Sequence, residues 1–564
     1  MQATALTFAL LGLEACPIRV EVDSGRGPAA FHLVGLAEAS VRESRVRVRS
    51  ALQQLGIDLG EFVITVNLAP ADMRKSGGSF DLAIAVAALA ALGKIPPAAL
   101  EGTALLGELS LSGALRPVRG VLPALCGAAA RGVTRAIVPA SNAREAASVP
   151  GISVGVADHL SEVIGHLRKG NGLAGPGAPP SFTPEASLFG IDFADVRGQH
   201  AARRALEIAA AGGHNVLMMG PPGSGKTMLA RRLPTILPAM VFDEALEVTA
   251  VHSVAGLLTS DAGLVRSRPF RAPHHTVSSA GLVGGGDPVR PGEVSLAHNG
   301  CLFLDELFEF RRSVLEALRQ PLEDGVVTIC RARARVTFPA KPIVVAAVNP
   351  CPCGFAGERS RRCSCSMERV RGYRAKLSGP LLDRMDLQIL LPPVDLSSLR
   401  SSAAGESSAK VRERVLAARA IQAGRRAAGE VSMGSNGELP LRDLERVAAP
   451  DDAGARILAA AMERLGLSAR AYGKVLRVAR TIADLDGVVA VRAAHVAEAV
   501  ATPMSRGGIA FCTASVSGCM LPPRPQPITT MMIATCQYGV STSIFDSDPM
   551  PMTISVSPTI GQIL

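Results

Sequence analysis

A glycine-rich turn between an apolar run and a helix-forming segment constrains the fold of this chain more than any other feature. The residues from Asn215 to Thr227, NVLMMGPPGSGKT, match the pattern G-x-x-x-x-G-K-[ST] from Gly220 onward. We expect Gly223 and Gly225 to let the backbone turn its N–H groups toward a phosphate at the start of a helix. The alternative is an incidental glycine-rich turn. The pattern predicts a strand, a turn and a helix that together bind a nucleotide.

The residues of this turn have separate expected tasks. Lys226 is expected to reach the β- and γ-phosphates, and the Thr227 hydroxyl is expected to ligate Mg²⁺. The predicted nucleotide-binding residues are Gly220, Pro221, Pro222, Gly223, Ser224, Gly225, Lys226, Thr227 and Met228.

Two further apolar runs end in polar side chains that would complete such a site. The run at 301–304 is followed by Asp305 and Glu306. We expect Asp305 to hold Mg²⁺ through water and Glu306 to polarise the attacking water, whereas the alternative is that these acids cap the next helix. The run at 342–348 ends in Asn349, which is expected to orient the lytic water as a sensor, although asparagine at a strand end is also a turn former.

The order of these three segments resembles that of the AAA+ ATPases, and longer stretches narrow the resemblance. Residues 270–321, which begin FRAPHHTVSSAGLVGGG, are similar to the magnesium-chelatase-like branch and, within it, to the ComM/YifB family. So are NLAPADMRKSGGSFDLAIA at 67–85, NPCPCG at 349–354 and ARTIADL at 479–485. The resemblance covers nearly everything up to about Ala501. It implies an α/β fold, in which an AAA+ αβα parallel sheet with a helical lid follows an α+β, Lon-protease-like (S5-like) domain.

The resemblance also implies an activity. Members of the family are similar to hexameric DNA helicases that promote branch migration while imported single-stranded DNA is integrated by homologous recombination in natural transformation. ATP and Mg²⁺ would be the cofactors, single-stranded or branched DNA the partner, and a homohexameric ring in the cytoplasm the working form. Two alternatives stay open: a magnesium-chelatase-like subunit that drives metal insertion into a porphyrin, and a protein-remodelling regulatory AAA+ ATPase.

Assembly into a ring would bring further residues to the nucleotide site. SGPLLDRMD at 378–386 resembles an arginine-finger segment, which implies that Arg384 reaches the γ-phosphate bound by the neighbouring subunit. The alternative is a surface Asp–Arg pair of little energetic weight. LSARAY at 467–472 resembles the second sensor, with Arg470 touching the nucleotide of its own subunit, and DFADVRGQ at 192–199 resembles the segment that flanks adenine.

Arginines alternate in the segment that precedes the sensor run. Arg331, Arg333 and Arg335 recur every second residue within 325–338, so one face of a strand would be strongly positive and could track a phosphate backbone. The resemblance makes this segment a hairpin in the pore of the ring, with the insertion around 274–286 as a second pore loop. A solvated edge strand is the alternative. The net charge of +10 is compatible with a polyanionic partner, and the two adjacent histidines of the insertion receive no assignment.

Four of the eleven cysteines form two Cys-X-Cys pairs separated by nine residues. Four thiolates on one loop can close a tetrahedral zinc site, with Arg359, Arg361 and Arg362 between them on an exposed lobe. Free thiols or another metal are the alternatives. Because this arrangement suits a metal better than disulfides, it favours the cytoplasm. The four residues are Cys351, Cys353, Cys363 and Cys365.

The first 165 residues resemble the Lon protease fold and place Ser79 at the position of the nucleophile. A serine of this class needs a nearby amine to take its proton. The matching lysine position, near Leu122, carries no base, and Lys75 is the remaining substitute. We therefore expect a domain for assembly or DNA handling and no proteolysis.

A length of 564 residues calls for several domains. The longest apolar run, Leu82 to Leu92, falls short of the ~20 residues that a membrane helix needs, so no membrane association is expected. No basic residue precedes the apolar stretch at the N-terminus, which favours a buried strand over a secretory signal. The expected domains are 1–168 (Lon-protease-like), 169–186 (a Gly- and Pro-rich linker), 187–396 (AAA+ core), 397–502 (helical lid) and 503–564 (a disordered tail, native or from a disrupted reading frame).

Overall fold

The computed structural model describes most of the chain up to Ala501. The described residues are 1–35, 38–71, 73, 75, 77–177, 190–259, 263–331, 334–357, 362–377, 379–393 and 405–501. Residues 178–186 of the expected linker, the expected tail, Arg333, Arg359 and Arg361 lie outside them. None of the described helices combines the length and the apolar character that crossing a bilayer requires.

The N-terminal region is built on a mixed seven-stranded sheet in the order β3-β4-β2-β1-β5-β8-β9. The first strand pairs antiparallel with the second along its whole length and parallel with β5. Pairing continues beyond the last helix of this region, because the Val156 amide donates to the Ala174 carbonyl. The strands are β1 (Gln2–Leu11), β2 (Glu14–Arg26), β3 (Ala30–Val34), β4 (Phe62–Ala69), β5 (Thr103–Leu105), β6 (Glu108–Leu109), β7 (Leu115–Arg116), β8 (Arg135–Pro139) and β9 (Ser153–Ala157).

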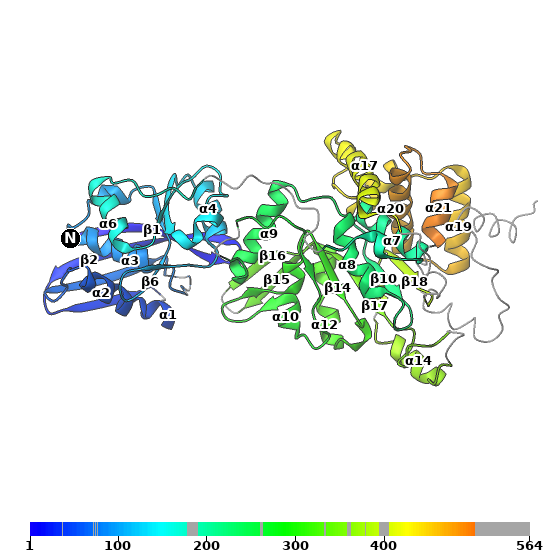
Figure 1. Cartoon of the computed structure of the whole chain (residues 1–564), viewed down its shortest axis with the longest axis horizontal. Coiled ribbons are helices and arrows are strands. Elements are labelled where there is room, and N and C mark those ends of the chain that lie inside the picture. Colours follow the sequence, from blue (N-terminus) through cyan, green and yellow to red (C-terminus); the bar gives the residue numbers. More distant parts are fainter. Residues whose placement is uncertain are drawn as a thin grey trace, which may run out of the picture. The chain divides into compact units, whose positions relative to one another are not determined.

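One helix that is apolar at every position after its first fills the centre of this region. All residues of α3 (Asp81–Ala91) are buried, because alanine, leucine, isoleucine and valine occupy every position after the first. It packs on β1 and β2 (Figure 1), so the apolar run is a core helix of an α+β unit, as expected. The other helices are α1 (Ala39–Arg42), α2 (Ser44–Gln54), α4 (Val121–Ala130), α5 (Ala143–Ala146) and α6 (Leu160–Lys169).

The following region contains a five-stranded, all-parallel sheet in the order β11-β14-β17-β10-β18. Its three central strands, β14, β17 and β10, read as continuous apolar runs because both faces are covered. Val216 and Met218 pack into a core with helices on one face, whereas Leu217 and Met219 pack into a second core on the other face. This is the αβα arrangement expected of the AAA+ fold. The strands are β10 (Val216–Met219), β11 (Phe270–Arg271), β14 (Cys301–Leu304), β17 (Ile343–Val348) and β18 (Leu387–Leu390).

Helices and two small hairpins surround this sheet. The helices α7 and α8 contribute to the first core, and α10 and α12 contribute to the second. The hairpins pair β12 (Gly284–Gly285) with β13 (Arg290–Pro291), and β15 (Val326–Arg331) with β16 (Ala334–Pro339). The helices are α7 (His200–Gly212), α8 (Lys226–Ile236), α9 (Phe242–Ala255), α10 (Ser279–Val283), α11 (Glu293–Leu296), α12 (Arg312–Ala317), α13 (Arg319–Asp324), α14 (Met367–Arg374) and α15 (Gly379–Leu382).

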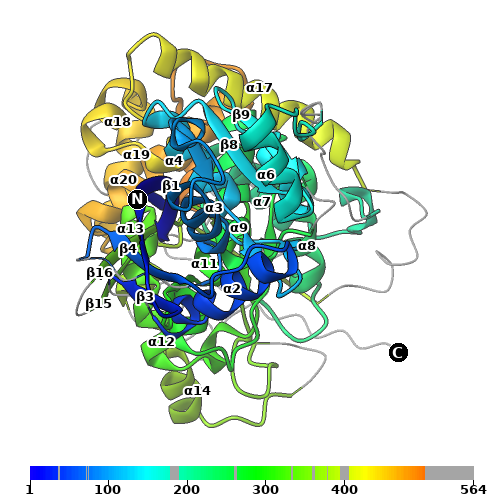
Figure 2. The ribbon, with the colours of Figure 1, turned by 90° about the vertical axis from the view of Figure 1, so that its left-hand side faces the viewer.

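A helical lid completes the described chain, as expected. Figures 1 and 2 both show α17, α19 and α20 grouped in one bundle. A buried carboxylate ties the bundle together: Asp484 accepts hydrogen bonds from Arg425 (2.9 Å), Arg480 (2.9 Å) and Asn436 (2.7 Å). The helices are α17 (Ser408–Ala427), α18 (Leu441–Val447), α19 (Asp452–Leu465), α20 (Ala469–Leu485) and α21 (Ala493–Ala501).

Candidate functional site

Three neighbouring parallel strands end at one edge of the sheet and bring predicted site residues together. The glycine-rich turn from Gly220 to Thr227, which we call the P-loop, follows β10. Asn349 follows β17, and Asp305 follows β14. Lys226 Nζ donates to Asn349 Oδ1 at 3.1 Å, and Thr227 Oγ1 donates to Asp305 Oδ2 at 2.8 Å. Residues more than a hundred positions apart therefore form one polar cluster.

Two glycines give the P-loop its shape. Gly223 and Gly225 have φ values of +79° and +90°, in the left-handed region that side chains disfavour. A Cβ at either position would meet no atom within 4 Å, so the backbone torsion and not crowding requires glycine there. Because α8 begins at Lys226, directly after Gly225, its first N–H groups form an anion-binding end.

Oxygen atoms surround the ammonium group of Lys226. Besides Asn349, it donates to the carbonyl groups of Gly220 (2.7 Å) and Pro221 (2.9 Å). Burial lowers the pKa of Lys226, while the nearby carboxylates of Asp305 and Glu306 oppose that change. The Lys226 ammonium group is held by neutral carbonyl oxygens, and it is suited to exchange these oxygens for those of a phosphate.

The backbone of Glu306 adopts a left-handed conformation, with φ +51° and ψ +48°. This conformation costs about 1–2 kcal/mol for a residue with a side chain. The Glu306 amide donates to Asp305 Oδ1 at 3.0 Å, and its carboxylate lies 3.6 Å from His275 Nδ1. The His275 ring also contacts His274 and Phe310. No role for these histidines could be predicted from local patterns, because only the tertiary fold brings the insertion to Glu306.

The donor atoms of this cluster fit Mg²⁺. The metal prefers oxygen ligands, and the Thr227 hydroxyl and the Asp305 carboxylate supply oxygens that already lie in contact. The adjacent glycine turn offers backbone N–H groups for phosphate. The residues present are therefore suited to an ATP–Mg²⁺ complex.

Arg384 and Arg470, the two arginines predicted to act in a ring, have other surroundings in the single chain. Arg384 forms an ion pair with Glu323 of α13. Arg470 is exposed in the first turn of α20. One turn further along α20, Lys474 donates to the carbonyl group of Met385 at 3.1 Å, so this helix contacts the segment that carries Arg384.

The arginine-rich segment is a hairpin and not one positive strand face. Its register pairs Arg331 with Ala334 and Cys330 with Arg335. Directly paired residues share a face of a hairpin and successive residues alternate, so Arg331 and Arg335 lie on opposite faces. The prediction of a single positive face is wrong, because the chain reverses direction within the arginine repeat. Both arginines are exposed, and Arg333 lies outside the described residues.

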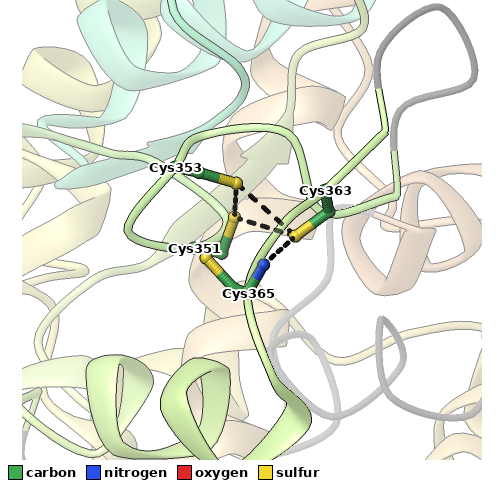
Figure 3. A group of neighbouring side chains, drawn as sticks. All are labelled: Cys351, Cys353, Cys363 and Cys365. Atoms are coloured by element: carbon green, nitrogen blue, oxygen red, sulfur yellow. Dashed lines mark hydrogen bonds between the residues drawn. The ribbon is translucent and has the colours of Figure 1, made fainter.

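The four predicted cysteines converge, with their sulfur atoms turned toward one another (Figure 3). All four sulfur atoms lie within 4.8 Å of one another. Three of the separations are 3.3 Å (Cys351–Cys353), 3.5 Å (Cys353–Cys363) and 3.7 Å (Cys351–Cys363). Disulfide sulfurs lie about 2.05 Å apart, whereas a tetrahedral zinc with Zn–S bonds of about 2.3 Å holds its sulfurs about 3.8 Å apart. The geometry suits a metal better than disulfides.

We call residues 350–366 the cysteine loop, of which 358–361 lie outside the described residues. Cys351 is buried, and the other three cysteines are half-buried. A hydrogen bond from the backbone of Phe355 is the largest of the influences that lower the pKa of Cys353 to about 6. The thiolate is the form that binds metals.

The Lon-like region holds its predicted serine and lysine in different settings. Ser79 is half-buried in the turn before α3, and Lys75 is buried, with its ammonium group donating to the carbonyl group of Pro70. Leu122, at the position where a lysine base would stand, is fully buried in α4. An apolar side chain in the core cannot accept the proton of a serine.

Comparisons with known proteins cover most of the chain. Three family models match: "Magnesium chelatase, subunit ChlI" over residues 192–399, "Subunit ChlI of Mg-chelatase" over 20–142, and "Magnesium chelatase, subunit ChlI C-terminal" over 405–502. The competence protein ComM of Haemophilus influenzae is 44% identical over 506 residues, which cover 88% of this chain and 96% of ComM. The uncharacterized protein YifB of Salmonella typhimurium is 44% identical over 499 residues, 88% of this chain and 95% of YifB.

A shorter likeness concerns the N-terminal region. Lon protease 1 of Bacillus subtilis is 28% identical over 179 residues, which cover 30% of this chain and 23% of the protease. It agrees with the predicted Lon-protease-like domain. The extent and identity of the longer matches establish the family: this chain belongs to the ComM/YifB family of magnesium-chelatase-like AAA+ ATPases.

Proposed function

We propose that this protein is an ATP-driven ring motor of the helicase type, which promotes branch migration while incoming DNA is integrated by homologous recombination in natural transformation. The observation that carries the proposal is the polar cluster that joins Lys226, Thr227, Asp305 and Asn349 at one sheet edge. The biological setting is taken from the similarity to ComM, which is named a competence protein.

ATP hydrolysis would use the residues of this cluster. Lys226 leaves its carbonyl partners for the β- and γ-phosphates, while Thr227 and Asp305 hold Mg²⁺. A metal held by these two side chains would supply positive charge that offsets the charge of the phosphates. Glu306 polarises the attacking water, and Asn349 orients it beside the γ-phosphate. The remaining P-loop residues cradle the phosphates through their backbone N–H groups.

A homohexameric ring would complete each site. Arg384 would exchange Glu323 for the γ-phosphate bound by the neighbouring subunit, where it stabilises the charge of the transition state. Arg470 would contact the nucleotide of its own subunit from the lid. Both roles require movement or assembly, because in the single chain Arg384 pairs with Glu323 and Arg470 is exposed in the first turn of α20.

DNA would pass the tip of the hairpin formed by β15 and β16. Arg331 and Arg335 lie on its two faces beside the turn, so the tip presents positive charge in two directions. Such a tip suits a phosphate backbone that crosses its end, with Arg333 as a third contact, and gives affinity without sequence choice. The net charge of +10 favours the same partner.

The four cysteines would hold a structural Zn²⁺ ion. Four thiolates are the ligand set of closed, tetrahedral zinc sites, and the sulfur separations agree with that geometry. A reducing compartment such as the cytoplasm would keep these thiols available. Elemental analysis of the purified protein should find about one zinc per chain, and metal-free protein would contradict the assignment.

We keep the expected domain boundaries as part of the proposal. The Lon-protease-like domain (1–168) would serve assembly or DNA handling, a linker (169–186) would lead to the AAA+ core (187–396), and the lid (397–502) would precede a tail (503–564). We do not adopt the chelatase or the protein-remodelling alternative, because the similarity to ComM runs along 88% of the chain.

ATP turnover with and without DNA tests this function. The wild-type rate should rise on addition of single-stranded or four-way-junction DNA, and the double variant Arg331→Ala, Arg335→Ala should lose that rise. Arg442→Ala is the matched control, because its side chain is 79% exposed and belongs to α18 of the lid. A rate that ignores DNA, or a double variant that keeps the stimulation, would refute a DNA motor.

A further inference from the structure

The cysteine loop touches the phosphate-binding turn at Gly354. A Cβ atom at this position would lie 2.5 Å from Cδ and 2.7 Å from Cγ of Pro222. Carbon atoms do not approach this closely, and a proline ring cannot rotate away as a long side chain can. The backbone of the cysteine loop therefore packs directly on the P-loop, with room for a hydrogen atom only.

The other limb of the cysteine loop is fixed to the side of the site that carries Asp305 and Glu306. Directly after Cys365 the chain enters α14, whose last residue, Arg374, donates from Nε to the carbonyl group of Pro350 at 3.1 Å. In the same helix, the Tyr373 ring packs edge-on against Phe308, with centroids 4.7 Å apart. The loop thus begins directly after β17 and ends beside the segment that follows Asp305 and Glu306.

The metal ligands flank the contact with the P-loop, two before Gly354 and two after it. Cys351 follows Asn349 by two residues, and Cys353 immediately precedes Gly354. A metal ion that joins them to Cys363 and Cys365 ties the limb that touches the P-loop to the limb that α14 holds. Asn349 and Gly354 would then keep a fixed distance from the P-loop, because both ends of their segment are restrained.

We infer that metal bound to the four cysteines is a positioning element for the ATP site: it holds Gly354 against Pro222 and Asn349 beside Lys226, and so sets the affinity for ATP. This inference rests on the proposed zinc site and ATPase function. It assigns the cysteine loop to the nucleotide site of its own subunit and not to DNA.

Two glycines of the loop allow a matched test. Gly354 and Gly357 have nearly identical φ values, +85° and +84°, so alanine brings the same backbone strain at both. A Cβ at Gly357 meets no atom within 4 Å, whereas one at Gly354 meets Pro222. In the full-length protein, Gly354→Ala should raise the dissociation constant of a fluorescent ATP analogue about tenfold relative to Gly357→Ala. Both variants should keep the wild-type zinc content.

A second variant removes the metal. The double substitution Cys353→Ser, Cys363→Ser should abolish zinc binding and raise the dissociation constant of the ATP analogue as Gly354→Ala does. KM for ATP should rise in parallel, by a larger factor than kcat falls, because the phosphate-binding turn is displaced. Both variants should keep the wild-type far-ultraviolet circular-dichroism spectrum, which separates a loss of ATP affinity from a loss of folding.

The outcomes separate this inference from the proposed function. Equal ATP affinity in Gly354→Ala and Gly357→Ala overturns the inference, and so does wild-type affinity in a zinc-free cysteine variant or zinc-free wild-type protein. Protein that binds zinc and shows the glycine contrast, yet hydrolyses no ATP, supports the inference while it refutes the proposed motor.

Discussion

Arg384 should act on ATP bound by the neighbouring subunit, and the energetics of its present contact make that exchange favourable. In the single chain its side chain is 22% exposed and pairs with Glu323, which is 53% exposed. Ion pairs this open to solvent contribute about 0–1 kcal/mol. An arginine finger raises turnover about 10³- to 10⁵-fold, which corresponds to about 4–7 kcal/mol of transition-state stabilisation. Arg384 therefore loses little by leaving Glu323.

Mixing two inactive variants tests this action across the subunit boundary. Arg384→Ala and Glu306→Gln should each reduce ATP turnover about a thousandfold. In a mixed ring, a site is competent when its own subunit carries the Arg384 substitution and its neighbour carries the Glu306 substitution. Random assembly at a ratio of one to one makes about one quarter of the sites competent, so about one quarter of the wild-type rate should return.

The assay is steady-state ATP hydrolysis at constant total protein across the mixing ratio. The rate should pass through a maximum at equal amounts of the two variants. Arg319→Ala is the control, because Arg319 is also an exposed arginine in an ion pair, 47% exposed with Glu316 as partner. Its mixtures with Glu306→Gln should show a rate that only falls. Mixtures of the two inactive variants that remain inactive at every ratio would refute action in trans.

Three further predictions concern the P-loop, the hairpin and the lid. Lys226→Ala should lose binding of a fluorescent ATP analogue, whereas Glu306→Gln should bind it and fail to hydrolyse ATP; turnover by either would show that the site is misassigned. Loss of Arg331 and Arg335 together should make the slope of log K against log[salt] for single-stranded DNA shallower by roughly 1.4, and an unchanged slope in fluorescence anisotropy would exclude phosphate contacts. Replacing the buried Asp484 by alanine leaves the guanidinium groups of Arg425 and Arg480 without their carboxylate partner. The free energy of unfolding, measured with urea, should fall by about 3–5 kcal/mol. A fall of less than about 1 kcal/mol would contradict the bridging role of Asp484.

Local patterns predicted the elements that position the nucleotide site. The P-loop pattern implies a strand before the turn and a helix after it, and β10 and α8 stand at those positions. The apolar run before Asp305 is the buried strand β14. These features follow from the sequence because a strand covered on both faces must be apolar throughout, and a glycine-rich turn restricts its own backbone.

Contacts between distant segments did not follow from the sequence. The alternation of Arg331 and Arg335 indicated one face, but where a hairpin turns decides which residues share a face, and the arginines themselves do not mark the turn. The approach of His275 to Glu306 and the packing of Gly354 on Pro222 depend on how loops from different strands meet. No local propensity encodes such contacts.

Movement of a DNA junction by the purified full-length protein tests the central claim most directly. A labelled four-way junction with homologous arms is incubated with the protein, ATP and Mg²⁺, and the products are separated by native electrophoresis. Wild-type protein should convert the junction into its branch-migrated duplexes, and Glu306→Gln should bind the junction without converting it. Conversion by Glu306→Gln at the wild-type rate, or no conversion by a wild-type protein that hydrolyses ATP, would contradict an ATP-driven DNA motor.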